Sequence, residues 1–199
     1  MEETGGSKPA EDAFNKLDAN DPEAFRAVFD RWCRPVFTFI LGMIGNRAVA
    51  EELTQETFVR AYRGLRTVRE QSRFSTWLFG VARNVAREAI RSRRATGLQV
   101  ELDDGQWRQL RDRQLTQEKA MMESELQSRV QSAVAGLPED QRLVFLLKVV
   151  SQMRYSEIAE VSGSSVAKLK TDLHRARATM RNKLAPYFED RVAGSRGGS

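Results

Sequence analysis

Apolar side chains recur at steps of three and four residues through most of the chain, which is the period of an α-helix. The first stripe follows Asp21-Pro22-Glu23, where an N-cap acid, a proline at the first helical position and an acid in the first turn favour a helix start. We expect Pro35 to kink or split this run into two helices, because proline lacks a backbone N–H and its ring clashes with the preceding turn. Gly45-Asn46 ends the run. Its apolar positions are Phe25, Val28, Phe29, Trp32, Val36, Ile40 and Met43.

Two further helices are predicted in the N-terminal half, at about residues 47–64 and 75–94. Residues 67–73 between them have the composition of a loop. No segment alternates apolar and polar residues with period two, so we predict no strands and an all-α fold. The inner positions are Leu53, Phe58, Ala61 and Tyr62 in the first helix and Trp77, Leu78, Val81, Ala82, Val85 and Ile90 in the second.

The composition changes after Arg94. Residues 95–114 carry an acidic cluster at 101–105 and little apolar periodicity, which indicates a linker. Helical periodicity resumes near Leu115, and Pro138 opens another helix over residues 139–150. Two short helices then precede a Gly/Ser-bearing tail from Ala193. The pattern predicts two small helical domains joined by a flexible linker.

Residues 155–177 have the pattern of a helix-turn-helix in the C-terminal domain. Gly163 can adopt the left-handed conformation of a tight turn, and Ser164 or Ser165 can cap the second helix. The buried face of that helix is expected at Val166, Leu169 and Leu173. An ordinary helical hairpin with a hydrated charged face is the alternative, but the polar and basic outer face favours entry into the DNA major groove. That face carries Lys168, Lys170, Thr171, Asp172, His174, Arg175 and Arg177.

The four basic side chains of this face are candidates for phosphate or base contacts. Asp172 cannot pair with phosphate; it either accepts from a cytosine amino group or steers a neighbouring arginine. His174 is expected to be a neutral polar contact at the DNA-facing surface.

Positive charge is concentrated in one part of the chain. The formal net charge is +5, yet residues 60–94 contain ten arginines and only two glutamates, whereas residues 1–24 are mainly acidic. This segregation favours a surface that meets nucleic-acid phosphates, because arginine binds phosphate bidentately and stacks on bases. A solvated helix face is the alternative, although such faces usually intersperse acids with bases.

Several function classes are excluded by what the sequence lacks. Cys33 is the only cysteine and His174 the only histidine, so an intramolecular disulfide and a Cys/His zinc site are impossible. No apolar run approaches 18 residues, and the N-terminus has no basic-then-apolar signal. No nucleophile–base pair or phosphate-binding glycine loop can be assembled. We therefore predict a cytoplasmic protein that is not an enzyme, binds no metal or cofactor and does not insert into membranes.

Four motifs, taken together and in order, resemble one family. They are residues 50–62 (AEELTQETFVRAY), 72–84 (SRFSTWL followed by ARN), 137–142 (LPEDQR) and the helix-turn-helix at 155–177. They are similar to the extracytoplasmic-function (ECF) RNA polymerase sigma factors of the sigma-70 family, over about residues 22–186. The resemblance implies an alternative sigma factor that binds core RNA polymerase, recognises minus-35 and minus-ten promoter elements, and melts the promoter.

The resemblance also implies a domain plan. A flexible lead at 1–20 precedes sigma region 2 at 21–95, which binds polymerase and recognises and melts the minus-ten element. A linker at 96–120 leads to sigma region 4 at 121–188, which recognises the minus-35 element, and a flexible tail occupies 189–199. The linker would thread into the polymerase, where Glu101, Asp103 and Asp104 either mimic nucleic acid or belong to a solvated tether.

Residue roles follow from the same resemblance. Region 2 would dock on the β′ clamp helices of the polymerase through Glu51, Glu52, Leu53, Thr54, Gln55, Glu56 and Phe58. The β flap of the polymerase would be a further contact of the protein. The minus-ten contacts would be Arg66, Arg69, Arg73, Phe74, Arg83, Asn84, Arg87 and Arg91. The minus-35 contacts would be Ser164, Ser165, Lys168, Lys170, Thr171, Asp172, His174, Arg175 and Arg177. Phe74 can be a stacking platform or a core residue, and the register of Trp77 with Leu78 favours the core.

Some positions depart from the family pattern. Ser165, Ala167, Lys168 and Asp172 stand where family members often have Pro, Gly, Thr and Arg, so the DNA sequence that is read here is open. The family implies an anti-sigma factor as a partner. Two rival interpretations remain at this point: a free-standing helix-turn-helix transcriptional regulator, and a helical adaptor that binds only protein.

Overall fold

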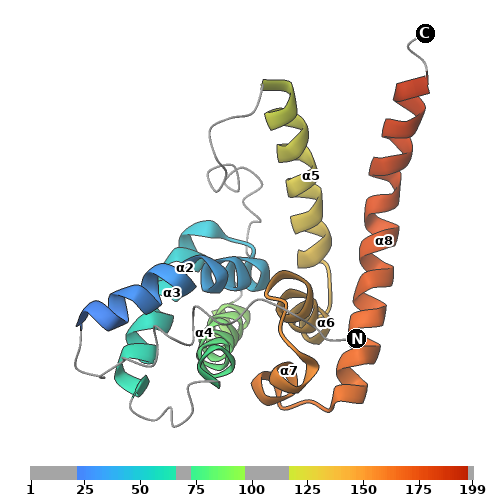
Figure 1. The fold of residues 1–199 in the computed structure, drawn as a ribbon. Coiled ribbons are helices and arrows are strands. Elements are labelled where there is room, and N and C mark those ends of the chain that lie inside the picture. The colour runs from blue at the N-terminus through green and yellow to red at the C-terminus, as the bar shows by residue number, and fades with distance from the viewer. Residues whose placement is uncertain (1–21, 66–72, 97–116, 197–199) are drawn as a thin grey trace, which may run out of the picture.

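Helices account for nearly all of the chain that the computed structural model describes, which is residues 22–65, 73–96 and 117–196 (Figure 1). The N-terminal half consists of α2 (Pro22–Ile44), α3 (Arg47–Gly64) and α4 (Phe74–Thr96). No strand occurs within these ranges, so the all-α prediction is confirmed. The predicted helix at 47–64 matches α3, and the one predicted at 75–94 is α4 with one extra residue before it and two after it. Of the predicted loop at 67–73, only Arg73 lies within the described residues. The linker acids and Asp21 lie outside them.

The expected break at Pro35 is wrong, because α2 continues through the proline as a single helix. The missing N–H of Pro35 leaves only the carbonyl of Arg31 without its helical partner, and Arg31 is exposed, so water can bind that oxygen. On both sides of the proline, α2 buries apolar residues such as Val28 and Phe39. Burial of one continuous face therefore outweighs the loss of one hydrogen bond.

Edge-to-face aromatic contacts form the core of the N-terminal half. Phe39 of α2 meets Phe79 of α4 with ring centroids 5.5 Å apart, and Trp32 lies 6.2 Å from Phe79. Trp77 is half-buried against this cluster, as its register predicted. Such aromatic pairs add to the stability that their buried area provides. They fix α4 against α2 and so set which face of α4 is turned outward.

The C-terminal half contains α5 (Gln117–Ala135), α6 (Glu139–Phe145), a π-helical turn η4 (Leu146–Val150), α7 (Tyr155–Ser162) and α8 (Val166–Arg196). The helix expected at 139–150 is present as α6 and η4. The expectation of two short final helices is half wrong, since α8 has 31 residues and extends into the predicted tail. Buried residues continue along it as far as Tyr187, so packing prolongs the helix.

The two halves pack directly against each other. Helix α2 contacts α5, α6 and η4, while α4 contacts α7. At the centre of this interface, Gly42 of α2 faces Leu146 of η4 so closely that a Cβ at residue 42 would lie 2.5 Å from Leu146 Cδ2. Any larger residue at position 42 would have to displace the tip of the Leu146 side chain or push the halves apart. None of the helices in the described ranges combines the length and apolarity that crossing a bilayer requires.

Arg142 of α6 joins the carboxyl-terminal ends of two other helices. Its Nη1 donates to the carbonyl of Met43 at 2.8 Å, and its Nη2 donates to the carbonyls of Ala135 and, at 3.0 Å, Leu137. Helix ends leave carbonyls without intrahelical donors, and a guanidinium supplies several donors in a fixed fork. Burial lowers the pKa of Arg142 below its ordinary value. The side chain therefore acts as a structural tie between the two halves.

Replacing Arg142 by methionine tests this tie. The Arg142→Met protein should lose about 2–3 kcal/mol of unfolding free energy, because buried carbonyl oxygens are left without donors. Urea unfolding followed by circular dichroism measures the loss. The same substitution at the exposed Arg181 of α8 is the control and should change stability by less than about 0.5 kcal/mol. Equal effects of the two substitutions would contradict the structural role of Arg142.

Candidate nucleic-acid interface

Helices α7 and α8 form the predicted helix-turn-helix. Gly163 ends α7 in the left-handed conformation, with φ of 71°, and its N–H donates to the carbonyl of Ala159 at 2.8 Å. Ser165 caps α8 by accepting from the N–H of Lys168 at 3.3 Å. Of the two serines that were candidates for the cap, Ser165 therefore fills the role. Ser164 instead donates its N–H to Ser162 Oγ at 3.1 Å.

The first turns of α8 divide into a buried and an exposed face, nearly as the sequence indicates. Leu169 and Leu173 are buried, whereas Val166 is 38% exposed and was wrongly assigned to the buried face. The exposed side chains are Lys168, Lys170, Thr171, His174, Arg175 and Arg177. They lie on one side of a helix that projects from a compact turn, which is the geometry a major-groove helix needs.

Asp172 does not belong to this exposed face. Its side chain is only 11% exposed and accepts a hydrogen bond from Lys168 Nζ at 2.6 Å. The prediction that Asp172 accepts from a cytosine or steers an arginine is therefore corrected: in this structure it positions a lysine. A carboxylate four residues after a lysine on the same helix face is a favourable spacing for such a pair.

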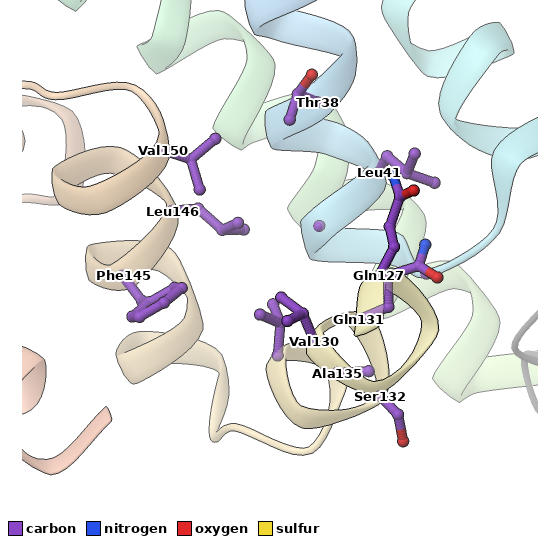
Figure 2. A pocket seen from close by; sticks show the side chains of 13 residues that line it. Thr38, Leu41, Gln127, Val130, Gln131, Ser132, Ala135, Phe145, Leu146 and Val150 are labelled. Carbon is purple, nitrogen blue, oxygen red and sulfur yellow. The ribbon is translucent and has the colours of Figure 1, made fainter. Parts of the chain in front are cut away.

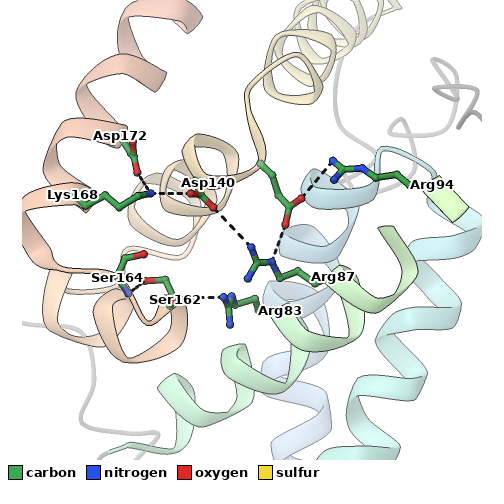
Figure 3. Close-up of polar contacts among 9 residues, drawn as sticks. Arg83, Arg87, Arg94, Asp140, Ser162, Ser164, Lys168 and Asp172 are labelled. Atoms are coloured by element: carbon green, nitrogen blue, oxygen red, sulfur yellow. Dashed lines mark hydrogen bonds and ion pairs between the residues drawn. The ribbon is translucent and has the colours of Figure 1, made fainter. Parts of the chain in front are cut away.

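Helix α4 turns a row of arginines toward the C-terminal half (Figure 3). Arg87 Nε contacts Glu139 Oε1 at 2.8 Å, and Arg94 Nη2 lies 3.5 Å from Glu139 Oε2. Arg83 Nη2 donates to the carbonyl of Ser162 at 3.1 Å, at the end of α7. Of the predicted minus-ten arginines, Arg83 is thus brought next to the helix-turn-helix, whereas Arg87 contacts the first turn of α6 and stays partly exposed.

Asp140 connects the two basic surfaces. Its Oδ2 accepts from Lys168 Nζ at 2.8 Å, and its Oδ1 lies 3.9 Å from Arg87 Nη2. The hydrogen bond from Lys168 lowers the pKa of Asp140, helped by the charges of Lys168, Arg87 and Arg83. The same bond raises the pKa of Lys168. Because both side chains are about half exposed, dissolved salt weakens this pairing.

Arg83 of α4 is partly desolvated. Partial burial, followed by the nearby charge of Arg87, lowers the pKa of Arg83. Its Nε is buried without an acceptor within the described part of the chain. A guanidinium in this position has lost water and gained only one hydrogen bond in return, so this contact is incomplete.

The remaining predicted minus-ten residues are distributed differently. Asn84 and Arg91 are exposed on α4, and Arg73 is exposed with Nη1 4.0 Å from Glu160 Oε2. Phe74 is 5% exposed and lies among Trp32 and Trp77, so the stacking role is corrected and the core alternative holds. Arg66 and Arg69 lie outside the described residues.

The predicted polymerase-binding residues of α3 also separate by exposure. Glu51, Glu52 and Gln55 are exposed, while Glu56 is half-buried and pairs with Arg60 at 2.7 Å. Phe58 and Thr54 are only 3% and 4% exposed, and Leu53 packs against the core. Phe58 and Thr54 therefore do not offer their side chains to a partner, which corrects that part of the prediction.

Two apolar residues on the exposed side of α3 were missed. Val59 is 42% exposed and Tyr62 is 49% exposed, and together with Glu52 and Gln55 they form a stripe at steps of three, four and three residues. The ring of Tyr62 stands edge-on to Phe25 of α2, with centroids 4.9 Å apart. Residues 52, 55, 59 and 62 recur at helical spacing, and this spacing predicts that the four side chains lie on one face of α3. The expected place of Tyr62 on the inner side of the helix is therefore wrong.

These features define a class of protein. A helix-turn-helix with a basic, exposed second helix lies beside an arginine-rich helix, and both are carried by one all-α chain. Such a combination is typical of a DNA-binding transcription factor with two separate DNA-facing surfaces.

Comparison with known proteins narrows the class. Residues 28–96 match the Sigma-70 region 2 family, and residues 127–180 match Sigma-70, region 4. The ECF RNA polymerase sigma factor SigW of Bacillus subtilis is 29% identical, over 86% of this chain and 94% of SigW. The ECF RNA polymerase sigma-E factor of Haemophilus influenzae is 28% identical, over 87% of this chain and 94% of its own. The chain belongs to the ECF sigma factors of the sigma-70 family.

Two solved structures share the fold. CnrH, in complex with the cytosolic domain of CnrY, superimposes with a TM-score of 0.64 and 22% identity, covering 88% of this chain and 97% of CnrH. The sigma factor RpoE of Bartonella quintana, in complex with the anti-sigma factor NepR, gives 0.64 and 21% identity, covering 81% of this chain and 96% of RpoE. Both similarities support the helical architecture described above.

The turn between α7 and α8 yields a stability prediction. Gly163→Ala should cost about 1–2 kcal/mol, because an L-residue with a Cβ is strained at positive φ, and nothing lies within 4 Å of the added methyl to offset the strain. Gly163→Asn should cost less, since asparagine tolerates this conformation. Urea unfolding of the three proteins measures the order. An alanine variant as stable as the glycine protein would mean that the turn relaxes.

Proposed function

We propose that this protein is an alternative sigma factor that binds core RNA polymerase and directs promoter-specific initiation of transcription. The observation that carries the proposal is the pairing of two DNA-facing surfaces in a chain that matches both sigma regions. The exposed face of α8 would contact the minus-35 element. Helix α4, with Asn84, Arg83, Arg87 and Arg91, would engage the minus-ten element. The protein would act in the cytoplasm as a binding subunit and leave catalysis to the polymerase.

Promoter melting requires that unpaired bases be held while the phosphates follow a basic track. Asn84 is exposed on α4 and offers both a donor and an acceptor to a base edge. Arg91, one helical turn beyond Arg87, is exposed and can meet a phosphate. The binding energy of these contacts would offset the cost of unstacking.

The polymerase contact is proposed on the exposed stripe of α3. Glu52 and Gln55 supply polar contacts, and Val59 and Tyr62 supply apolar area that a partner can bury. This stripe would dock on the β′ clamp helices. Region 4 would meet the β flap, as in the family pattern.

An anti-sigma factor is the proposed regulatory partner. RpoE of Bartonella quintana, which shares this fold, was solved with the anti-sigma factor NepR. A protein inhibitor of this kind would act by covering the stripe on α3 or the basic surfaces of α4 and α8.

A promoter-opening assay tests the function. With core polymerase and a promoter duplex that carries a fluorescent base in its minus-ten region, the protein should raise the fluorescence as that base unstacks. Asn84→Ala should lower the opening about tenfold, the typical value of a base-edge contact, without loss of polymerase binding. Asn182→Ala, at an exposed asparagine of α8, is the matched control. Absence of polymerase-dependent opening across a promoter library would refute the sigma function. Binding of the protein alone to duplex DNA would then favour a free-standing regulator. Binding to neither DNA nor polymerase would favour an adaptor that binds only protein.

The polymerase surface has its own test. Val59→Asn should weaken binding to core polymerase about fivefold, because burial of an exposed valine contributes roughly 1 kcal/mol. Val149→Asn is the control, since Val149 of η4 is 40% exposed and Val59 is 42% exposed. Fluorescence anisotropy of the labelled protein titrated with core polymerase gives both affinities. A larger effect at Val149 would place the main contact elsewhere.

A further inference from the structure

An apolar pocket of about 250 Å³ lies where α2 meets α5 and η4 (Figure 2). Its walls come from three elements, with Leu41 on α2, Val130 on α5 and Leu146 on η4. Figure 2 shows Leu146 and Val130 projecting into the same space from different sides. Val150, which also lines the pocket, is 44% exposed. The pocket therefore reaches the surface, and a molecule can enter it from solvent.

The polar groups of the pocket are few and neutral. None of the described residues that line it carries a charge. Its polar side chains are those of Thr38, Gln127, Gln131 and Ser132. Figure 2 shows the two glutamines on the side of Leu41, across the pocket from the apolar wall of η4. An amide offers both a donor and an acceptor, so this side suits a neutral polar group. A charged group would lose its hydration here without meeting an opposite charge.

The apolar wall limits what can occupy the pocket. A water molecule inside a protein needs several polar partners, and Val130, Leu146 and Val150 offer none. An engineered apolar cavity of about 150 Å³ stays dry and binds benzene. The pocket described here is larger, so a bicyclic aromatic ring fits where benzene would leave space. Such a molecule would also supply the dispersion contacts that the wall lacks.

The wall on η4 is built by an unusual backbone turn. The N–H of Ser151 donates to the carbonyl of Leu146 at 2.9 Å, five residues earlier in the chain, which is the bond of a π-helix. Turns of this kind are rare and are frequent at functional sites. This one carries Leu146 and Val150, both of which line the pocket. The backbone turn is thus a second sign, independent of the volume, that the pocket has a role.

We propose that this pocket binds a small uncharged molecule whose apolar body has about the size of a bicyclic aromatic ring. Its apolar part lies against Leu146, Val150 and Val130, and a single neutral polar group faces the glutamines of α5. This site is distinct from the candidate DNA contacts on α4 and α8 and from the exposed stripe of α3. The inference does not rest on the proposed function, because binding requires neither polymerase nor DNA.

The test measures binding of indole to the full chain by isothermal titration calorimetry. We expect a dissociation constant on the order of 0.1 mM, an ordinary ligand efficiency for a molecule of about nine non-hydrogen atoms. Indole at ten times this concentration should raise the unfolding temperature by about 3–5 °C, because the ligand binds only the folded chain. A matched pair of larger probes tests the charge. The neutral indole-3-ethanol should bind at least about tenfold more tightly than the anionic indole-3-acetate.

Three variants locate the site. Val130→Phe and Ala135→Leu each add side-chain volume at residues that line the pocket, from two positions of α5, and should weaken indole binding at least about tenfold. Val149→Phe is the control, because Val149 is an exposed residue of η4 that does not line the pocket. It should leave the affinity within about twofold. Far-UV circular dichroism checks that each variant retains its helices.

Several results would overturn the inference. They are the absence of indole binding to the unmodified protein, unchanged binding in both filled variants, an equal loss in Val149→Phe, and tighter binding of the anionic probe. Weaker binding of Val130→Phe to core polymerase, with no indole binding to the unmodified protein, would instead assign the pocket to an apolar side chain of a protein partner. Failure of polymerase-dependent promoter opening would refute the sigma function and leave the binding measured by calorimetry intact.

Discussion

The arginines of α4 that face the C-terminal half need acceptors there, and this need constrains how the two halves of the molecule meet. Arg83 and Arg87 lie one helical turn apart, and partial burial, followed by the charge of Arg87, lowers the pKa of Arg83. A row of guanidinium groups packs against another protein surface only if that surface supplies acceptors. The carboxylates of α6 and the backbone carbonyl of Ser162 provide them. The position of the helix-turn-helix against α4 follows from this requirement.

Much of the fold could be predicted from the sequence, because helical periodicity and capping signals are local. The bounds of α3, the left-handed glycine at 163 and a serine cap at 164 or 165 were all recognisable from residue type and spacing. The errors at Pro35 and along α8 arose where tertiary burial outweighed a local signal. At both places an apolar face continues past a residue that disfavours or ends helices, and packing of that face prolongs the helix.

The sequence identified many residues of the candidate site but not how these residues are arranged in space. Spacing identified the exposed face of α8, yet it could not separate Phe58 and Phe74, which are core residues, from aromatic residues available to a partner. Periodicity alone does not reveal whether an aromatic residue lies beneath a neighbouring helix. The contacts of Glu139 and Asp140 were beyond sequence reasoning for another reason: many acids and arginines are available, and only the packing of the halves decides which of them meet.

Helix α8 gives the helix-turn-helix a mechanical property of its own. Its 31 residues form one helix, and at about 1.5 Å per residue it is roughly 46 Å long. The turns that carry the exposed basic face occupy one end, and Tyr187, packed at 5.3 Å from the guanidinium of Arg129 on α5, lies about 30 Å away toward the other. The contact of Tyr187 with α5 therefore holds α8 at a second point, far from the turn at Gly163, so the direction of the helix is fixed at both places.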